Sequence, residues 1–209
     1  MPPSVSGSYN YRETIAFSMV EAVQAINPPN VAEKNELVRM LLTGNHTDTT
    51  EADFKKFMGN TEEFMKAEAG GVSKPILNRS KPGRLSGMCY RNAIAEYYET
   101  KNPIVIGWEG VLAGDGYLTV MPHAFNYDKK RKCYYDTACN YKKGDNRRAV
   151  WPLVDGDAAL ARLQTSENFA ETWGGFVFIL WKGEAYNIRA YGLSGDGTRR
   201  VSLQSKMPL

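Results

Sequence analysis

The sequence predicts an α+β fold in which helices come first and antiparallel strands follow. Up to about residue 69, apolar residues recur every three or four positions, which is the spacing of one face of a helix. Beyond residue 100, apolar residues gather in short runs rich in β-branched and aromatic side chains, with turn-sized gaps between the runs. A chain of 209 residues, 43% of them hydrophobic, is long enough to bury one sizeable core.

The first third of the chain predicts three helices, because three amphipathic stretches are each followed by a helix-ending signal. Thr49 or Thr50 can cap the third helix, and Gly70 and Gly71 end it. We interpret this helical region, residues 1–71, as a lid or as part of the core. The expected helices cover residues 12–26, about 31–43 and about 50–69.

The rest of the chain, residues 72–209, is predicted to form the main region. Residues 72–87 are typical of a loop, and residues 88–100 are expected to form a helix with Ser86 as its N-cap. A short helix is expected over residues 157–163. The expected strands cover residues 104–108, 117–121, 123–127, 132–137, 176–181 and 185–191.

Composition excludes several classes of protein. No apolar run approaches the roughly 18 to 20 residues of a membrane-spanning helix. The N-terminus lacks the basic start and apolar stretch of a secretory signal, so the cytoplasm is the expected compartment. Glycines 192, 195 and 197 precede a strand-like segment, so they indicate a hairpin turn and no nucleotide cofactor. Three cysteines are too few for a disulfide framework, so at least one thiol is free.

Cys89 is the best candidate nucleophile in the chain. It lies at the start of a predicted helix, where unpaired backbone N–H groups and the positive end of the helix dipole favour a thiolate. A cysteine nucleophile needs a base, and the sequence offers His46 and His123. His46 lies in a loop between helices and is typical of a solvated turn, so His123 is the candidate base.

Asp136 is the candidate third member of this site. If residues 128–131 form a four-residue hairpin loop, Tyr127 pairs with Lys132, and His123 lies directly opposite Asp136. A three-residue loop instead places Asp136 opposite Ala124. In the first register Asp136 can orient the imidazole ring, as the acid of a catalytic triad does; in the second the two residues are diagonal neighbours.

These three segments resemble the transglutaminase-like branch of the papain-like cysteine fold. The resembling segments are Gly87-Met88-Cys89, His123-Ala124-Phe125 and Tyr135-Asp136-Thr137, within about residues 84–140. Phe125 stands where that branch usually has tryptophan. The resemblance implies that residues 72–209 are a catalytic core, with a nucleophile-bearing helix packed on an antiparallel sheet. It also implies acyl transfer through a thioester at Cys89.

We therefore predict a cysteine-dependent hydrolase or acyltransferase that acts on amide or ester groups of a protein or peptide and needs no cofactor. Cys89, His123 and Asp136 are the predicted catalytic residues. The backbone N–H of Cys89 and the side chain of Ser86 or Tyr90 are candidate donors to the oxyanion. Trp108 is a candidate wall of the acyl pocket, or ordinary core.

Two other readings stay open at this point. Cys133 and Cys139, together with Cys89 and His123, have the ligand types of a zinc site but not a typical spacing, so no metal is predicted. A non-catalytic scaffold on the same fold is the alternative function, in which basic hairpins engage nucleic acid or an acidic partner; nucleic acid is not favoured. The basic residues are Lys129, Lys130, Arg131, Lys132, Lys142, Lys143, Arg147 and Arg148.

Overall fold

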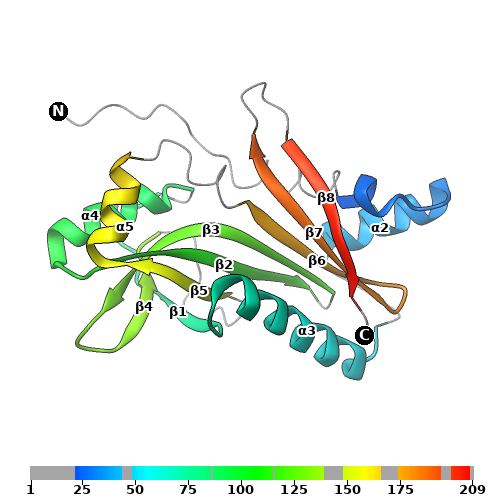
Figure 1. Cartoon of the computed structure of the whole chain (residues 1–209), viewed down its shortest axis with the longest axis horizontal. Coiled ribbons are helices and arrows are strands. Elements are labelled where there is room, and N and C mark those ends of the chain that lie inside the picture. The colour runs from blue at the N-terminus through cyan, green and yellow to red at the C-terminus, as the bar shows by residue number, and fades with distance from the viewer. Residues whose placement is uncertain are drawn as a thin grey trace.

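The computed structural model describes residues 22–43, 49–85, 87–114, 116–138, 148–165, 174–193 and 199–207. Figure 1 shows one strongly curved sheet with helices packed around it, which confirms the α+β class. None of the helices in these ranges is long and apolar enough to cross a membrane. The strands are β1 (Lys74–Asn78), β2 (Ile104–Gly114), β3 (Tyr117–Asp128), β4 (Cys133–Asp136), β5 (Arg148–Asp155), β6 (Gly175–Trp181), β7 (Glu184–Leu193) and β8 (Arg199–Met207).

Five of the strands close on themselves into a small barrel. The order in the sheet is β2-β5-β1-β4-β3-β6-β7-β8, and β2 also pairs with β3. The ring is therefore β2-β5-β1-β4-β3, and β6, β7 and β8 extend from β3 as an antiparallel sheet. Most pairs are antiparallel, as predicted, but β1 and β4 are parallel. β1 lies in the segment expected to be a loop, so that expectation is wrong for residues 74–78.

The barrel interior is a small apolar cluster with a polar end. Ile76, Val105, Phe125 and Val150 come from four ring strands and pack together, with Tyr134 of β4 against them. A cluster with members on every ring strand lies inside the ring. Because side chains alternate along a strand, residues two positions from these also face inward.

Helices α2 (Val31–Thr43) and α3 (Glu51–Ala69) cover the extended part of the sheet (Figure 1). Leu37 and Leu41 of α2 are buried against one face of β6 and β7, and Phe57 and Met65 of α3 are buried against the other face. Both predicted helices are confirmed, and Thr50 caps α3 by accepting the backbone N–H of Asp53. Residues 22–26 are helical, and residues 12–21 of the predicted first helix lie outside the described part.

Helices α4 (Cys89–Thr100) and α5 (Gly156–Thr165) lie side by side at the other end of the molecule (Figure 1). Ala93 of α4 and Ala159 of α5 pack on Ile104, Ile106 and Ala124, which are on the outer face of the barrel. This contact fixes the start of α4 near the barrel wall. Both helices were expected from the sequence, within one or two residues.

Gly107 allows β5 to pass close to β2. A Cβ atom at this position would lie 2.1 Å from the backbone oxygen of Trp151. We expect Gly107→Ala to destabilise the fold by about 1 to 3 kcal/mol, because a backbone strand has to shift. Urea unfolding measures this change. The matched control is Gly59→Ala in α3, where nothing lies within 4 Å. That control should stabilise by up to about 1 kcal/mol, and equal effects of the two substitutions would contradict the prediction.

Candidate active site

The nucleophile candidate Cys89 is the first residue of α4, as predicted. The N-cap residue is Met88, which forms no side-chain cap, and Gly87 before it has a φ of 75°. The sequence-based choice of Ser86 as N-cap is therefore corrected to Met88; Ser86 itself lies outside the described residues. Because no side chain of Met88 takes up the first N–H groups of α4, they can serve an oxyanion.

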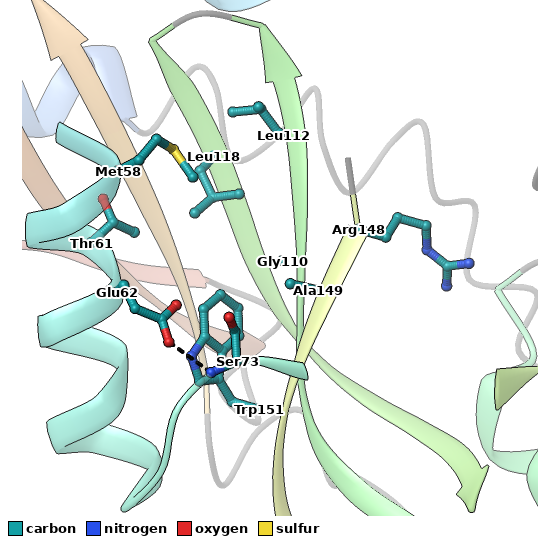
Figure 2. A pocket seen from close by; sticks show the side chains of 10 residues that line it. All are labelled: Met58, Thr61, Glu62, Ser73, Gly110, Leu112, Leu118, Arg148, Ala149 and Trp151. Carbon is teal, nitrogen blue, oxygen red and sulfur yellow. Dashed lines mark hydrogen bonds between the residues drawn. The ribbon is translucent and has the colours of Figure 1, made fainter. Parts of the chain in front are cut away.

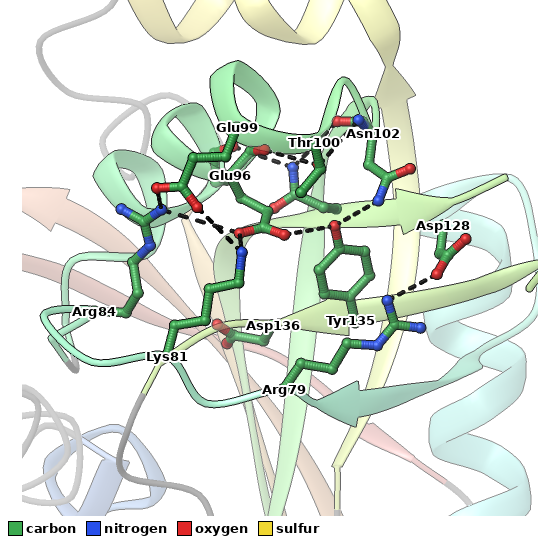
Figure 3. A network of polar contacts seen from close by, with 12 residues as sticks. Arg79, Lys81, Arg84, Glu96, Glu99, Thr100, Asn102, Asp128, Tyr135 and Asp136 are labelled. Carbon is green, nitrogen blue, oxygen red and sulfur yellow. Dashed lines mark hydrogen bonds and ion pairs between the residues drawn. The ribbon is translucent and has the colours of Figure 1, made fainter. Parts of the chain in front are cut away.

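A network of polar contacts holds the segment before Cys89 against α4 (Figure 3). Lys81 Nζ lies 2.5 Å from Glu96 Oε2, and Arg84 pairs with Glu99. The buried carboxylate of Glu96 also accepts a hydrogen bond from Tyr135 Oη at 3.0 Å. Tyr135 is the neighbour of Asp136 on β4. The network therefore fixes the start of α4 relative to the strand that carries the acid.

His123 and Asp136 meet, but in a different register from either one predicted. Tyr127 pairs with Tyr134, and Phe125 therefore lies opposite Asp136. The turn is Lys129 to Lys132, one residue later than predicted, because the carboxylate of Asp128 accepts the backbone N–H groups that follow it. His123 is then a diagonal neighbour of Asp136 on the inner face of the barrel.

The two side chains form a short, buried contact at the polar end of the barrel. His123 Nε2 lies 2.9 Å from Asp136 Oδ2, and the ring is 8% exposed. The other carboxylate oxygen of Asp136 accepts the backbone N–H of Ala138 at 2.9 Å. The imidazole of His123 stacks on Phe125, with ring centroids 6.0 Å apart. Asp136 is thus fixed by its own hydrogen bond and in turn fixes the ring of His123.

Two further charged residues belong to this site and were missed in the sequence. Glu109 Oε2 lies 3.4 Å from His123 Nδ1, and Arg148 pairs with both Glu109 and Asp136, the latter at 3.1 Å. The four side chains close a ring of ion pairs, His123–Asp136–Arg148–Glu109. They come from β3, β4, β5 and β2. Each carboxylate has two cationic partners, so the burial of these charges is compensated.

The charges around His123 favour its protonated form. Burial alone lowers the pKa of the ring, but the charges of Glu109 and Cys89 and hydrogen bonds with Asp136 and Cys89 raise it well above its ordinary value of 6.5. The pKa of Asp136 is held well below 3.8: burial opposes this shift, and the contacts with His123, Ala138 and Arg148 outweigh it. These contacts therefore favour an imidazolium beside a carboxylate.

The sulfur of Cys89 completes the arrangement. Cys89 is half-buried, and it is among the groups whose charge and hydrogen bonding raise the pKa of His123, which places the two side chains near each other. The structure thus brings together the three residues that the sequence singled out as nucleophile, base and acid.

The other predicted site residues have different positions. Trp108 lies on the outer face of the barrel wall, because its neighbour Gly107 is the residue opposite His123. It is buried against Phe176, and its Nε1 donates to the backbone oxygen of Gly174 at 3.2 Å. Trp108 is part of the core, which is the second of the two roles expected for it from the sequence. Tyr90 is half-buried against the cluster between α4 and α5.

The zinc reading gains no support from the structure. Among the described residues, no group of three or more His, Cys, Asp or Glu side chains is arranged to hold a metal ion. The sulfur of Cys133 instead accepts a hydrogen bond from Arg79 at 3.2 Å. Cys139 and His46 lie outside the described residues.

The basic residues also divide in the structure. Lys129 to Lys132 are exposed at the tip of the β3–β4 turn. Arg148 is buried, with 6% of its surface exposed, and belongs to the ring of ion pairs. This placement corrects the assignment of Arg148 to a solvated basic hairpin. Lys142, Lys143 and Arg147 lie outside the described part of the chain.

A cavity of about 130 Å³ lies away from this site, between α3 and the sheet (Figure 2). Met58 and Glu62 of α3 line it, with Leu118 and Trp151 opposite. Arg148 borders the cavity, but its guanidinium points away from the other lining residues. Neither Cys89 nor His123 lines the cavity, so we place the chemistry at the ring of charges and not there.

Comparison of the chain with models of protein families, with curated proteins and with solved structures finds no match.

Proposed function

We propose that the protein is a cysteine-dependent hydrolase or acyltransferase that acts on an amide or ester group of a protein or peptide. The observation that carries the proposal is the placement of Cys89 at an uncapped helix N-terminus near His123, whose ring is itself held by Asp136 at 2.9 Å. These are the parts that thiol acyl transfer needs: a nucleophile, a proton carrier and an orienting acid.

In the first proposed step, the Cys89 thiol gives its proton to His123, which forms an ion pair of thiolate and imidazolium. The imidazolium and the N-terminus of α4 both stabilise negative charge on the sulfur. Glu109, Asp136, Arg148 and protonated His123 sum to zero charge, so the thiolate does not face an excess of carboxylates. This balance favours the ion pair between Cys89 and His123.

In the acylation step, the sulfur attacks the carbonyl carbon, and the negative charge moves to the carbonyl oxygen. Backbone N–H groups at the start of α4 stabilise that oxygen. The intermediate then collapses to a thioester, and His123 gives its proton to the leaving amine or alcohol. Asp136 keeps the ring in the orientation that this transfer requires.

In the second step, water or an acceptor amine attacks the thioester, and neutral His123 takes up its proton. The carbonyl re-forms, the carbon–sulfur bond breaks, and Cys89 leaves as a thiolate. The products are an acid when water attacks and an amide when an amine attacks. Both outcomes restore the starting ion pair.

The arrangement also supports the papain-like, transglutaminase-like core proposed from the sequence. Cys89 begins α4, which packs on the strands of the barrel. His123 and Asp136 lie on β3 and β4, two antiparallel neighbours in the same sheet. We therefore extend the proposal to a papain-like, transglutaminase-like core that acts on amide or ester groups of a protein or peptide.

Selective alkylation tests the proposed nucleophile. We expect iodoacetamide to label Cys89 at least about tenfold faster than Cys133, because only Cys89 lies beside an imidazolium. Peptide mapping after short exposures at pH 7 measures both rates in one sample. Cys133 is a matched internal control, since it is also half-buried.

Turnover of a panel of amide and ester substrates completes the test. Activity should be lost in Cys89→Ala and kept in Cys133→Ala, with both variants folded. Equal labelling of the two cysteines would contradict the proposal. Binding of a polyanion that collapses with added salt and survives Cys89→Ala would favour the scaffold function instead.

A further inference from the structure

Glu109 is the only charged residue between positions 104 and 114, in a strand that is otherwise apolar or glycine. Its side chain faces the inside of the barrel, and the residue is 2% exposed. A buried carboxylate costs several kcal/mol unless it is paired, so this position serves a specific contact. Its contacts are with His123 and Arg148.

The geometry of the contact with His123 shows how Glu109 acts on the ring. The distance of 3.4 Å between Oε2 and Nδ1 is an ion-pair distance, longer than the usual N–H···O hydrogen bond of up to about 3.2 Å. Glu109 therefore attracts the charge of the ring without taking up its N–H.

Arg148 explains why two carboxylates can face one imidazole. Without it, Glu109 and Asp136 would repel each other across the ring of His123. The guanidinium bonds both carboxylates and holds Glu109 at its position. The charged or titratable groups that face His123 are Glu109 from β2, Asp136 from β4, and Cys89 from α4, with Arg148 of β5 behind the two acids.

We propose that Glu109 is a positioning residue for His123: its carboxylate, held by Arg148, lies beside Nδ1 and stabilises the charged imidazole. The inference rests on the proposed function for its catalytic meaning. It adds a second acid, on the Nδ1 side, to the Asp136 contact on the Nε2 side. Without Glu109, His123 loses its proton at a lower pH, so the ion pair of Cys89 and His123 breaks up at a lower pH than in the wild-type protein.

The direct test is the titration of His123 by NMR, in the wild-type protein and in Glu109→Gln. Removal of the negative charge makes the charged ring less favourable, so the pKa of His123 should fall by about 1 to 3 pH units. The chain has two histidines, and the His123→Gln variant assigns the signals. An unchanged midpoint in Glu109→Gln would overturn the inference.

The matched control is Glu96→Gln. Glu96 is equally buried, at 2%, and ion-paired, to Lys81, but it makes no contact with the ring of His123. We expect this variant to lose stability and to leave the midpoint of His123 within about 0.3 pH units of wild type. A merely structural role of Glu109 predicts the same unchanged midpoint in both variants.

A second variant covers the case in which Glu109→Gln does not fold. In Asp136→Asn, Glu109 is the remaining carboxylate beside the ring, so the pKa of His123 should stay above 6.5. A midpoint at or below 6.5 would contradict a role for Glu109. The result is independent of turnover.

Alkylation separates this inference from the proposed function. Turnover in Glu109→Gln should decline at lower pH than in wild type, in step with the shifted midpoint, because protonated His123 is the proposed acid. If the NMR midpoint shifts while Cys89 reacts no faster than Cys133, the proposed function fails and the electrostatic coupling stands. If Cys89 is reactive and the midpoint does not shift, the inference fails alone.

Discussion

Arg148→Met should destabilise the protein by about 3 to 5 kcal/mol, because it leaves two buried carboxylates without their shared cation. Glu109 and Asp136 are each 2% exposed, and Arg148 contacts both. Methionine has a similar volume, so the loss reflects charge and not a cavity. Chemical denaturation measures the change, and for a chain of this size we expect a fall in Tm of roughly 10 °C or more.

The control for this prediction is Lys206→Met. Lys206 pairs with Glu184, and both side chains are exposed. Exposed ion pairs contribute up to about 1 kcal/mol, so the control should change stability little. The double variant Glu109→Gln/Arg148→Met should recover at least about 1 kcal/mol relative to Arg148→Met, because it removes one uncompensated charge. If the changes in the free energy of unfolding caused by the two substitutions simply add, Arg148 does not act through Glu109.

Asp136→Asn should reduce turnover about 10³- to 10⁴-fold, as loss of the orienting acid does in a catalytic triad. An amide at this position cannot stabilise the imidazolium as a carboxylate does, and its NH₂ group can turn toward the ring nitrogen. The fall should appear in kcat, with little change in KM, because Asp136 acts on the ring and not on the substrate.

Asp128→Asn is the matched control for Asp136→Asn. Asp128 is also a buried acid on an adjacent strand, and it pairs with Arg79 at 2.8 Å. Its pKa is lowered by the backbone N–H of Arg131 and by Arg79, without any contact with His123. The control should lose stability and keep its kcat. Equal losses of turnover in the two variants would mean that the effect of Asp136→Asn is structural.

The helices and the three candidate residues could be predicted because their signals are local. Thr50 and Gly70 mark the ends of α3, and the apolar period of α4 places Cys89 at its start. The prediction that His123 and Asp136 meet required only that consecutive strands pair. The register was wrong because the carboxylate of Asp128 binds the backbone of the turn, which residue type alone does not reveal.

Glu109 and Arg148 were missed because neither position was expected to be in a strand: the predicted strand 104–108 ends just before Glu109, and β5 was not predicted. Arg148 ends a run of basic residues that is typical of a solvated hairpin tip. Only the pairing of β5 with β2 directs its side chain into the barrel. Glu109 did give a signal: a single carboxylate in an otherwise apolar strand. The closed barrel was not predicted either, because β1 is short and its parallel pairing with β4 links segments about 60 residues apart.

The ring of charges has a consequence for how the chain acquires its reactivity. Its four members come from four separate strands. His123 and Asp136 are on β3 and β4, and Glu109 and Arg148 are on β2 and β5. A partly assembled barrel contains an unbalanced set of these charges and no fixed proton carrier beside the sulfur. On the proposed function, a nascent or damaged chain would therefore be spared premature acylation, and only the completed barrel would support the reaction.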